Sequence, residues 1–214
     1  MTGLLEVGSY TRDLGASLER MIENALDWEH LPHTHQSSFS AIRVLEHGAC
    51  GWRAEARLAD GRPVTIDLRL TDGGWVARTG AANRILSEIR TRASSTGPDS
   101  CRVEVRFLVD SPAPEKRAAI GAAYQRLYAD LYDEDERLMI ARAAALRRGP
   151  DALKQRRPVT LPDGTAATAP VYCPHQGLTL DADPDADGLI TCPWHGYRVD
   201  IRTGRCTQPA ALLT

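Results

Sequence analysis

The chain has 214 residues, of which 43% are hydrophobic and 25% are charged, and its formal net charge is −2. This composition is typical of a globular chain with a buried core, and we interpret its Lys and Arg residues as dispersed, which argues against a nucleic-acid partner. No apolar run approaches membrane-spanning length, and the first residues lack the pattern of a secretion signal. We therefore expect a cytoplasmic protein without a membrane partner.

The N-terminal segment predicts a strand followed by a helix. Residues 4–10 predict the strand, and residues 14–31 predict the helix, broken once near Asn24. Pro32 disfavours helical geometry at the residue before it, so we expect the helix to end there.

A polar motif lies at the end of this helix and consists of Asn24, Asp27, His30 and His35. Asp27 and His30 share a helix face, and a bend at Pro32 lets His35 return toward the same point. Two imidazoles with a carboxylate from elsewhere in the chain form the facial triad of non-haem iron(II) oxygenases. The competing interpretation is a polar helix end with surface histidines.

Six segments with alternating apolar and polar residues follow. They lie at residues 39–45, 52–58, 64–70, 74–78, 85–93 and 101–109. Asp60-Gly61-Arg62 joins two of them and is a hairpin signal. The alternation predicts an antiparallel sheet with one buried face, and it places Cys101 in the core.

Residues 114–148 predict a long helix that ends at Gly149-Pro150. Its apolar residues predict the buried face and are Ile120, Tyr124, Leu127, Leu131 and Leu138. Between Leu131 and Leu138 the pattern lacks one apolar residue. Glu134 or Asp135 occupies its place, which puts a carboxylate on the apolar face. A buried carboxylate needs a partner. The competing interpretation is an exposed acidic cluster.

Two short motifs of cysteine and histidine lie in the C-terminal part, at residues 173–177 (Cys-Pro-His-Gln-Gly) and 192–196 (Cys-Pro-Trp-His-Gly). Two Cys and two His can hold zinc, but zinc sites usually group their cysteines and their histidines at short spacing, whereas here Cys and His alternate. The pattern favours a [2Fe-2S] cluster. Cys50, Cys101 and Cys206 remain, an odd number that fits a reducing compartment.

These motifs resemble the Rieske family, and within it the ferredoxin and oxygenase branch. Leu178 and Trp194 stand where respiratory Rieske proteins carry a disulfide. Tyr197 and Val199 stand where those proteins place a Ser and a Tyr whose hydroxyls reach cluster sulfurs. Fewer hydrogen bonds to the sulfurs imply a lower reduction potential.

The resemblance extends to the N-terminal motif, which is similar to the mononuclear-iron motif of Rieske oxygenases. It implies that His30, His35 and Asp135 bind the iron, with Glu134 as the second choice for the third ligand, and that His33 is not a ligand.

The resemblance also assigns the cluster ligands and two catalytic residues. One iron of the cluster would take two thiolates and the other two imidazoles, and these ligands are Cys173, Cys192, His175 and His195. Asn24 and Asp27 are the predicted catalytic residues, and Asp27 would connect a cluster histidine with an iron-ligand histidine.

We therefore expect an α+β chain with two domains. Residues 1–149 would form a START-like domain of the helix-grip fold that carries the mononuclear iron, residues 150–157 a linker, and residues 158–214 an all-β Rieske domain. Rieske oxygenases normally carry these two domains in the opposite order.

The resemblance implies a Rieske-type non-haem iron mono- or dioxygenase. It would use O2 and electrons from an NAD(P)H-dependent reductase or a ferredoxin to hydroxylate or demethylate a small organic substrate, for example an aromatic one. A homotrimer is the implied assembly, and the short linker near Pro150 favours electron transfer between subunits. The alternative is a Rieske ferredoxin-like electron carrier whose START-like domain binds a ligand or a partner and holds no iron. A structural zinc module is the third interpretation.

Overall fold

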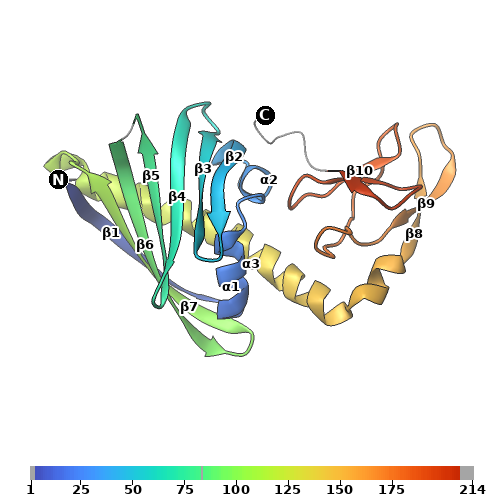
Figure 1. Ribbon diagram of the computed structural model, residues 1–214, viewed down its shortest axis with the longest axis horizontal. Helices are drawn as coiled ribbons and strands as arrows, with labels where there is room; N and C mark the ends of the chain where they lie inside the picture. The colour runs from blue at the N-terminus through green and yellow to red at the C-terminus, as the bar shows by residue number, and fades with distance from the viewer. Residues whose placement is uncertain (1–2, 83, 208–214) are drawn as a thin grey trace.

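A computed structural model of the protein describes residues 3–82 and 84–207. One large sheet with a long helix is followed by a smaller region with two short sheets (Figure 1). None of the described helices combines the length and the apolar character that a membrane span requires.

Seven antiparallel strands form the large sheet, in the order β1-β7-β6-β5-β4-β3-β2. Their bounds are β1 Leu4–Leu14, β2 Phe39–Gly48, β3 Gly51–Leu58, β4 Pro63–Thr71, β5 Gly74–Ala81, β6 Arg84–Gly97 and β7 Ser100–Asp110. All six alternating segments are strands, and each is longer than predicted because ladder hydrogen bonds continue beyond the last apolar residue. Cys101 lies in the core, as predicted.

The first predicted helix is divided in two. Helix α1 (Leu18–Leu26) begins later than predicted because β1 continues through residue 14, and it ends at Asp27. Helix α2 (Leu31–Thr34) follows, with Pro32 in its first turn. The prediction that Pro32 ends a helix was therefore wrong: in a first turn the missing N–H of proline has no helical acceptor to lose.

The long helix predicted at residues 114–148 is present, and its first turn is the short 3-10 helix η1 (Pro114–Lys116). Helix α3 (Arg117–Arg148) follows and packs against one face of the large sheet (Figure 1). It lies close to β1 at Gly121, where a side-chain carbon would collide with the backbone carbonyl of Val7. Phe107 of β7 stacks on Tyr124 of α3, with ring centroids 5.3 Å apart.

The buried face of α3 differs in part from the predicted one. Leu127 exposes 38% of its surface, whereas Tyr132, Asp135 and Leu138 are buried. The prediction followed the leucines, but the ring of Tyr132 fills the position against the sheet. The predicted carboxylate on this face is present, since Asp135 is the buried one.

The chain then passes through η2 (Pro150–Lys154) into a small β region at the right of Figure 1. Its strands are β8 Arg156–Thr160, β9 Ala166–Pro170, β10 Leu189–Thr191, β11 Arg198–Asp200 and β12 Cys206–Thr207. This region has a core of its own, which includes Leu180, Ile190 and Val199. The domain boundaries that we expect from the sequence stay a prediction.

Candidate metal centres

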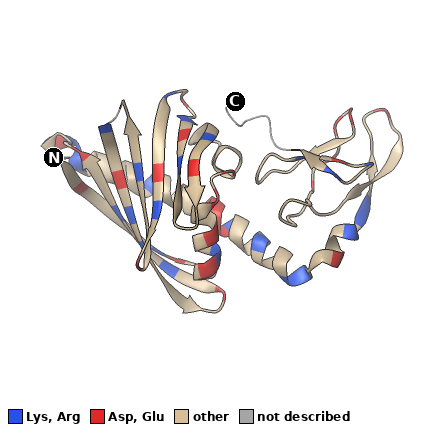
Figure 2. Ribbon diagram, viewed as in Figure 1, with Lys and Arg blue, Asp and Glu red and all other residues tan. Residues whose placement is uncertain are grey.

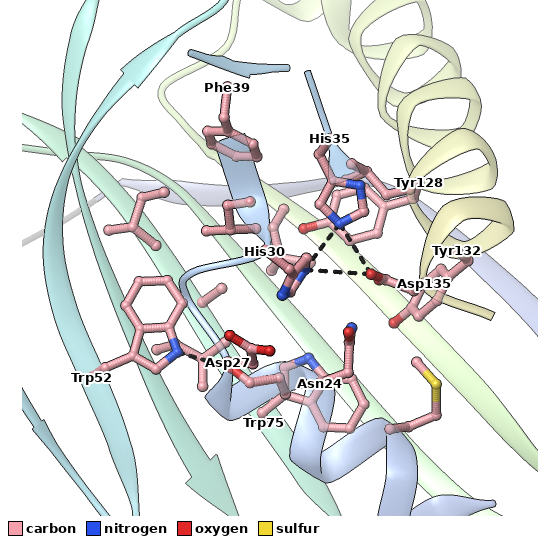
Figure 3. A pocket seen from close by; sticks show the side chains of 18 of the residues that line it. Asn24, Asp27, His30, His35, Phe39, Trp52, Trp75, Tyr128, Tyr132 and Asp135 are labelled. Carbon is pink, nitrogen blue, oxygen red and sulfur yellow. Dashed lines mark hydrogen bonds and ion pairs between the residues drawn. The ribbon is translucent and has the colours of Figure 1, made fainter. Parts of the chain in front are cut away.

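The three predicted iron ligands meet between α2 and α3 (Figure 3). His30 Nε2 lies 3.2 Å from His35 Nε2, and Asp135 Oδ1 lies 3.0 Å from His35 Nε2 and 3.5 Å from His30 Nε2. All three residues are buried. Among the described residues, this is the one group of three metal-binding side chains whose ligand atoms all lie within 4.8 Å of one another.

Helix α2 explains why the two histidines face the same point. His30 caps its N-terminus and His35 caps its C-terminus, so a single helical turn separates them. Pro32 fixes φ within that turn. Both rings are directed toward Asp135 on α3, as Figure 3 shows. The sequence prediction ascribed the convergence to a bend at Pro32, whereas a turn of helix produces it.

The triad fits a metal ion better than it fits a hydrogen-bond network. Asp135 Oδ1 and His30 Nδ1 are buried and have no hydrogen-bond partner among the described residues. Ligand atoms about 2.0–2.1 Å from one ion lie roughly 3.0–3.4 Å apart, close to the distances observed here. Burial alone would raise the pKa of Asp135, but the imidazoles of His30 and His35 hold it below its ordinary value. The carboxylate is therefore in the charged form that binds metals.

Two residues beside the triad are not placed to bind the metal ion. Glu134, the second choice for the third ligand, lies on the far side of His35, with its Oε2 2.6 Å from His35 Nδ1. A carboxylate at that place orients the imidazole and fixes its tautomer. The ring of His33, which we predicted not to be a ligand, packs against Gly196 of the second cysteine and histidine loop.

The two cysteine and histidine loops share one backbone structure. In each loop the glycine N–H donates to the carbonyl of the cysteine, and the cysteine N–H donates to the carbonyl of the residue after the glycine. The glycines have φ values of +74° at Gly177 and +68° at Gly196, a conformation that costs glycine nothing. Both loops contain the motif Cys-Pro-x-x-Gly, which thus encodes two matching backbone structures.

The side chains of the four predicted cluster ligands face one another. The rings of His175 and His195 are 4.9 Å apart, and the Nδ1 atoms of both are buried without a hydrogen-bond partner in the described part of the chain. The neighbouring thiol of Cys192 raises the pKa of Cys173. Within the described residues, no three of these ligand atoms gather as closely as the triad does, whereas a single zinc ion requires such a gathering. The arrangement therefore argues against a single zinc ion.

Asp27 connects the two centres. Its Oδ2 lies 2.8 Å from His195 Nε2, and its side chain lines the same cavity as His30 and His35. Burial alone would raise the pKa of Asp27, but the hydrogen bond with His195 lowers it to about 2. Burial alone would lower the pKa of His195, and the bond with Asp27 raises it to about 9. In the neutral ring, the 2.8 Å hydrogen bond with Asp27 places the proton on Nε2, and Nδ1 is then the nitrogen that faces a metal.

The second cluster histidine has a carboxylate partner that sequence reasoning missed. Glu29 Oε2 lies 3.8 Å from His175 Nε2 and accepts a hydrogen bond of 3.1 Å from Tyr197 OH. The Tyr197 ring stacks on His175. The sequence carried no signal for it, because in the predicted helix residues two positions apart do not share a face.

Both contacts of the second loop with α2 lie within one chain. Thr34 Oγ1 donates to Trp194 O at 3.0 Å, and a side-chain carbon on Gly196 would lie 2.5 Å from His33 Nδ1. The short linker, which we expected to favour contacts between subunits, does not keep the loops away from their own Asp27. The end of α3 leads the chain away to the small β region at the right of Figure 1, and the loops of that region point back toward α2.

A cavity of about 150 Å³ adjoins the triad (Figure 3). Its walls are mostly apolar and aromatic and include Met21, Leu31, Phe39, Trp52, Trp75 and Ile89. No Lys or Arg occurs among the described residues that line it. Asn24, a predicted catalytic residue, lines the cavity and has a buried Oδ1 without a hydrogen-bond partner there. An apolar cavity of this volume accepts a benzene-sized ring.

Comparison with known families identifies the C-terminal part. Residues 135–212 match the family model described as the Rieske [2Fe-2S] domain. This part of the chain, which begins within α3 and contains both cysteine and histidine loops, is therefore a Rieske domain, and such a domain implies a [2Fe-2S] cluster. No curated protein matches the chain.

Solved structures resemble the N-terminal part. The Zhui aromatase/cyclase from Streptomyces sp. R1128 is 12% identical, with a TM-score of 0.53, over 65% of this chain and 96% of that one. A START superfamily protein from Mycobacterium smegmatis is 19% identical, with a TM-score of 0.45, over 61% of this chain and 97% of that one. At these identities the likeness concerns the fold alone. The expected α+β class, a large antiparallel sheet with a long helix before a small Rieske region, is confirmed.

Proposed function

We propose that this protein is a Rieske-type non-haem iron oxygenase, which hydroxylates or demethylates a small organic substrate with O2 and electrons from a reductase or a ferredoxin. The observation that carries the proposal is the contact between His195 and Asp27. It joins a Rieske loop to the wall of the cavity in which His30, His35 and Asp135 converge. An electron carrier without its own iron has no need for this buried set of ligands.

Two groups of residues would hold the cofactors. The cluster ligands are Cys173, His175, Cys192 and His195, and the ligands of the mononuclear iron(II) are His30, His35 and Asp135. When bound, the cluster supplies single electrons and the iron(II) supplies the activation of O2.

The protein's own carboxylates orient the imidazoles. Asp27 holds the proton of His195 at Nε2 and so fixes that ring between the two centres. Glu134 accepts from His35 Nδ1, which leaves Nε2 turned toward Asp135. Because the triad is buried, the residues around it also exclude bulk water from the cavity.

The cavity supports a neutral substrate of about one ring. Its volume suits a single ring, and an anionic substrate would lie near Asp27 and Asp135 without a cation from the described lining. Asn24 Oδ1 is in place to accept a hydrogen bond from a substrate hydroxyl or amine. Phenol and aniline have these features, whereas benzoate carries a negative charge.

A single-turnover experiment tests the proposal. Protein loaded with iron is reduced with dithionite, freed of excess reductant and mixed with O2 and phenol, aniline or benzoate, and oxygenated products are quantified. We expect product from the neutral rings, little from benzoate, and none from Asp135→Ala, whose cluster spectrum should remain. Product formation that Asp135→Ala leaves unchanged would overturn the proposal, as would the absence of product from wild type with every ring offered.

A further inference from the structure

Positive charge is concentrated where the two parts of the chain are joined. Residues 142–157, which we call the basic arm, contain one acidic residue, Asp151, in a chain whose net charge is −2. The basic residues of the arm are Arg142, Arg147, Arg148, Lys154, Arg156 and Arg157. Figure 2 shows them along the end of α3 and the segment beyond it. The interpretation of Lys and Arg as dispersed was therefore wrong for this segment.

Four of the six basic residues of the arm are exposed, whereas Arg142 and Arg157 are half-buried and pair with Glu23 and Asp183. Arg147 and Lys154 expose 63% and 83% of their side chains, and their ion pairs with exposed aspartates lie at the surface, where such pairs contribute little. Arg148 and Arg156 donate to backbone carbonyls. Within the described part of the chain, neither forms an ion pair with a carboxylate. A positive surface potential therefore remains.

A groove of about 260 Å³ is lined by both the basic arm and the first cluster loop. Leu146 and Leu153 lie in it and expose 50% and 40% of their surfaces, next to the guanidinium of Arg148. Pro174 and Gln176 of the cluster loop also line it. Exposed leucines with arginines around them have the anatomy of a protein interface, with an apolar centre and a polar rim.

Hydrogen bonds connect the basic arm directly to the cluster loop. Arg142 Nη1 donates to Gln176 O, and Arg148 Nη2 donates to Gly177 O, both at 2.9 Å. These two carbonyls immediately follow the predicted ligand His175 in the sequence. A protein seated in the groove would thus be separated from the cluster ligands by the thickness of one loop.

The other side of the cluster site faces inward. His195 is fully buried against Asp27, whereas the side chain of His175 is 23% exposed. An electron donor in solution can therefore approach the histidine of the first loop, whereas the histidine of the second loop is covered. The second loop, which contacts α2, lies on the side toward the triad.

We propose that the basic arm and its groove form the docking site for an acidic one-electron donor protein of the ferredoxin type. In the step that docking serves, the donor is oxidised by one electron and the Rieske cluster is reduced by one electron, and no bond forms or breaks. Transfer is downhill because plant-type [2Fe-2S] ferredoxins have lower reduction potentials than Rieske centres. The inference rests on the cluster of the proposed function but not on the mononuclear iron.

Binding of a plant-type ferredoxin to the cluster-loaded full chain tests the proposal. Oxidised ferredoxin is titrated calorimetrically at low ionic strength, and reduced ferredoxin is mixed with the protein in a stopped-flow instrument. The test variant is Arg147→Glu with Lys154→Glu. The matched control is Lys116→Glu with Arg126→Glu, which reverses two exposed charges at the other end of α3. We expect the test variant to weaken binding and slow cluster reduction about tenfold or more, and the control to change both less than about twofold.

The outcomes separate this inference from the proposed function. Reduction of every variant by dithionite shows that its cluster is present, and wild type without a cluster would contradict the proposed function itself. Equal losses in test and control variants, or none in either, would overturn the docking site. So would binding of duplex DNA in place of ferredoxin, or a change of oligomeric state in the test variant without a change in ferredoxin binding.

Discussion

Gly196→Ala should disrupt the contact between the second cluster loop and α2. The substitution meets two separate obstacles. Gly196 has a φ of +68°, a left-handed conformation that costs other residues about 1–2 kcal/mol. The added carbon would also lie 2.5 Å from His33 Nδ1 and 2.6 Å from His33 Nε2, and such overpacking costs typically about 1–3 kcal/mol. We therefore expect a loss of about 2–5 kcal/mol in the free energy of unfolding.

His33→Ala separates these two contributions. It removes the ring that the new methyl group meets, so in the His33→Ala background Gly196→Ala should cost only the backbone contribution of about 1–2 kcal/mol. The coupling free energy between the two positions should then be about 1–3 kcal/mol. Because His33 is not a proposed ligand, the iron content of His33→Ala should equal that of wild type.

Urea unfolding of the cluster-loaded chain measures this double-mutant cycle. Tryptophan fluorescence reports the loss of the packed core, and visible absorption reports the loss of the cluster. Free energies that add within about 0.5 kcal/mol would show that His33 and Gly196 do not touch. The contact between the cluster loop and α2 would then be refuted.

Three further predictions concern single residues. His175→Ala should abolish the electron paramagnetic resonance signal of low average g-value, and a retained signal would exclude His175 as a ligand. In wild type we expect the reduction potential of the cluster to lie in the low part of the Rieske range of about −150 to +300 mV. Asp27→Asn should keep both kinds of metal but slow single turnover, because the amide no longer holds the His195 proton; an unchanged rate would remove Asp27 from the mechanism. Glu88 is buried between Arg78 and Arg90, which hold its pKa below the ordinary value of 4.5 although burial alone would raise it. Glu88→Gln should therefore lower the free energy of unfolding at neutral pH, and the difference from wild type should shrink as the pH falls below 4.5; a difference that stays constant there would contradict the ion pairs.

The large sheet and α3 could be predicted because their signals are local. Alternation along residues 101–109 decides which side chains are buried, whatever the rest of the chain does. The meaning of Pro32 could not be decided in the same way, since proline is compatible with both the end of one helix and the first turn of another. The buried stripe of α3 was misjudged at Leu127 because the contact with the sheet, and not hydrophobicity alone, selects the face.

The metal ligands were accessible from sequence because most of them lie close together along the chain. His30 and His35 are separated by one helical turn, and each cluster loop contains its own cysteine and histidine. Glu29 was missed because it meets His175 and Tyr197 only when the Rieske loops pack against the N-terminal part. The groove of the basic arm was missed because it forms only when the first cluster loop packs against the end of α3. The pairing of Asp27 with a cluster histidine of its own chain depends on the same packing.

Metal analysis of protein purified without oxygen tests the central claim most directly. Wild type should contain about three irons per chain, and Asp135→Ala about two, with the Rieske resonance signal unchanged in the variant. The reason is that Asp135 belongs to the triad and touches none of the cluster ligands that the structure brings together. Two irons per chain in wild type, with no loss of iron in Asp135→Ala, would contradict the oxygenase and favour an electron carrier. Zinc without visible absorbance would contradict both the oxygenase and the electron carrier.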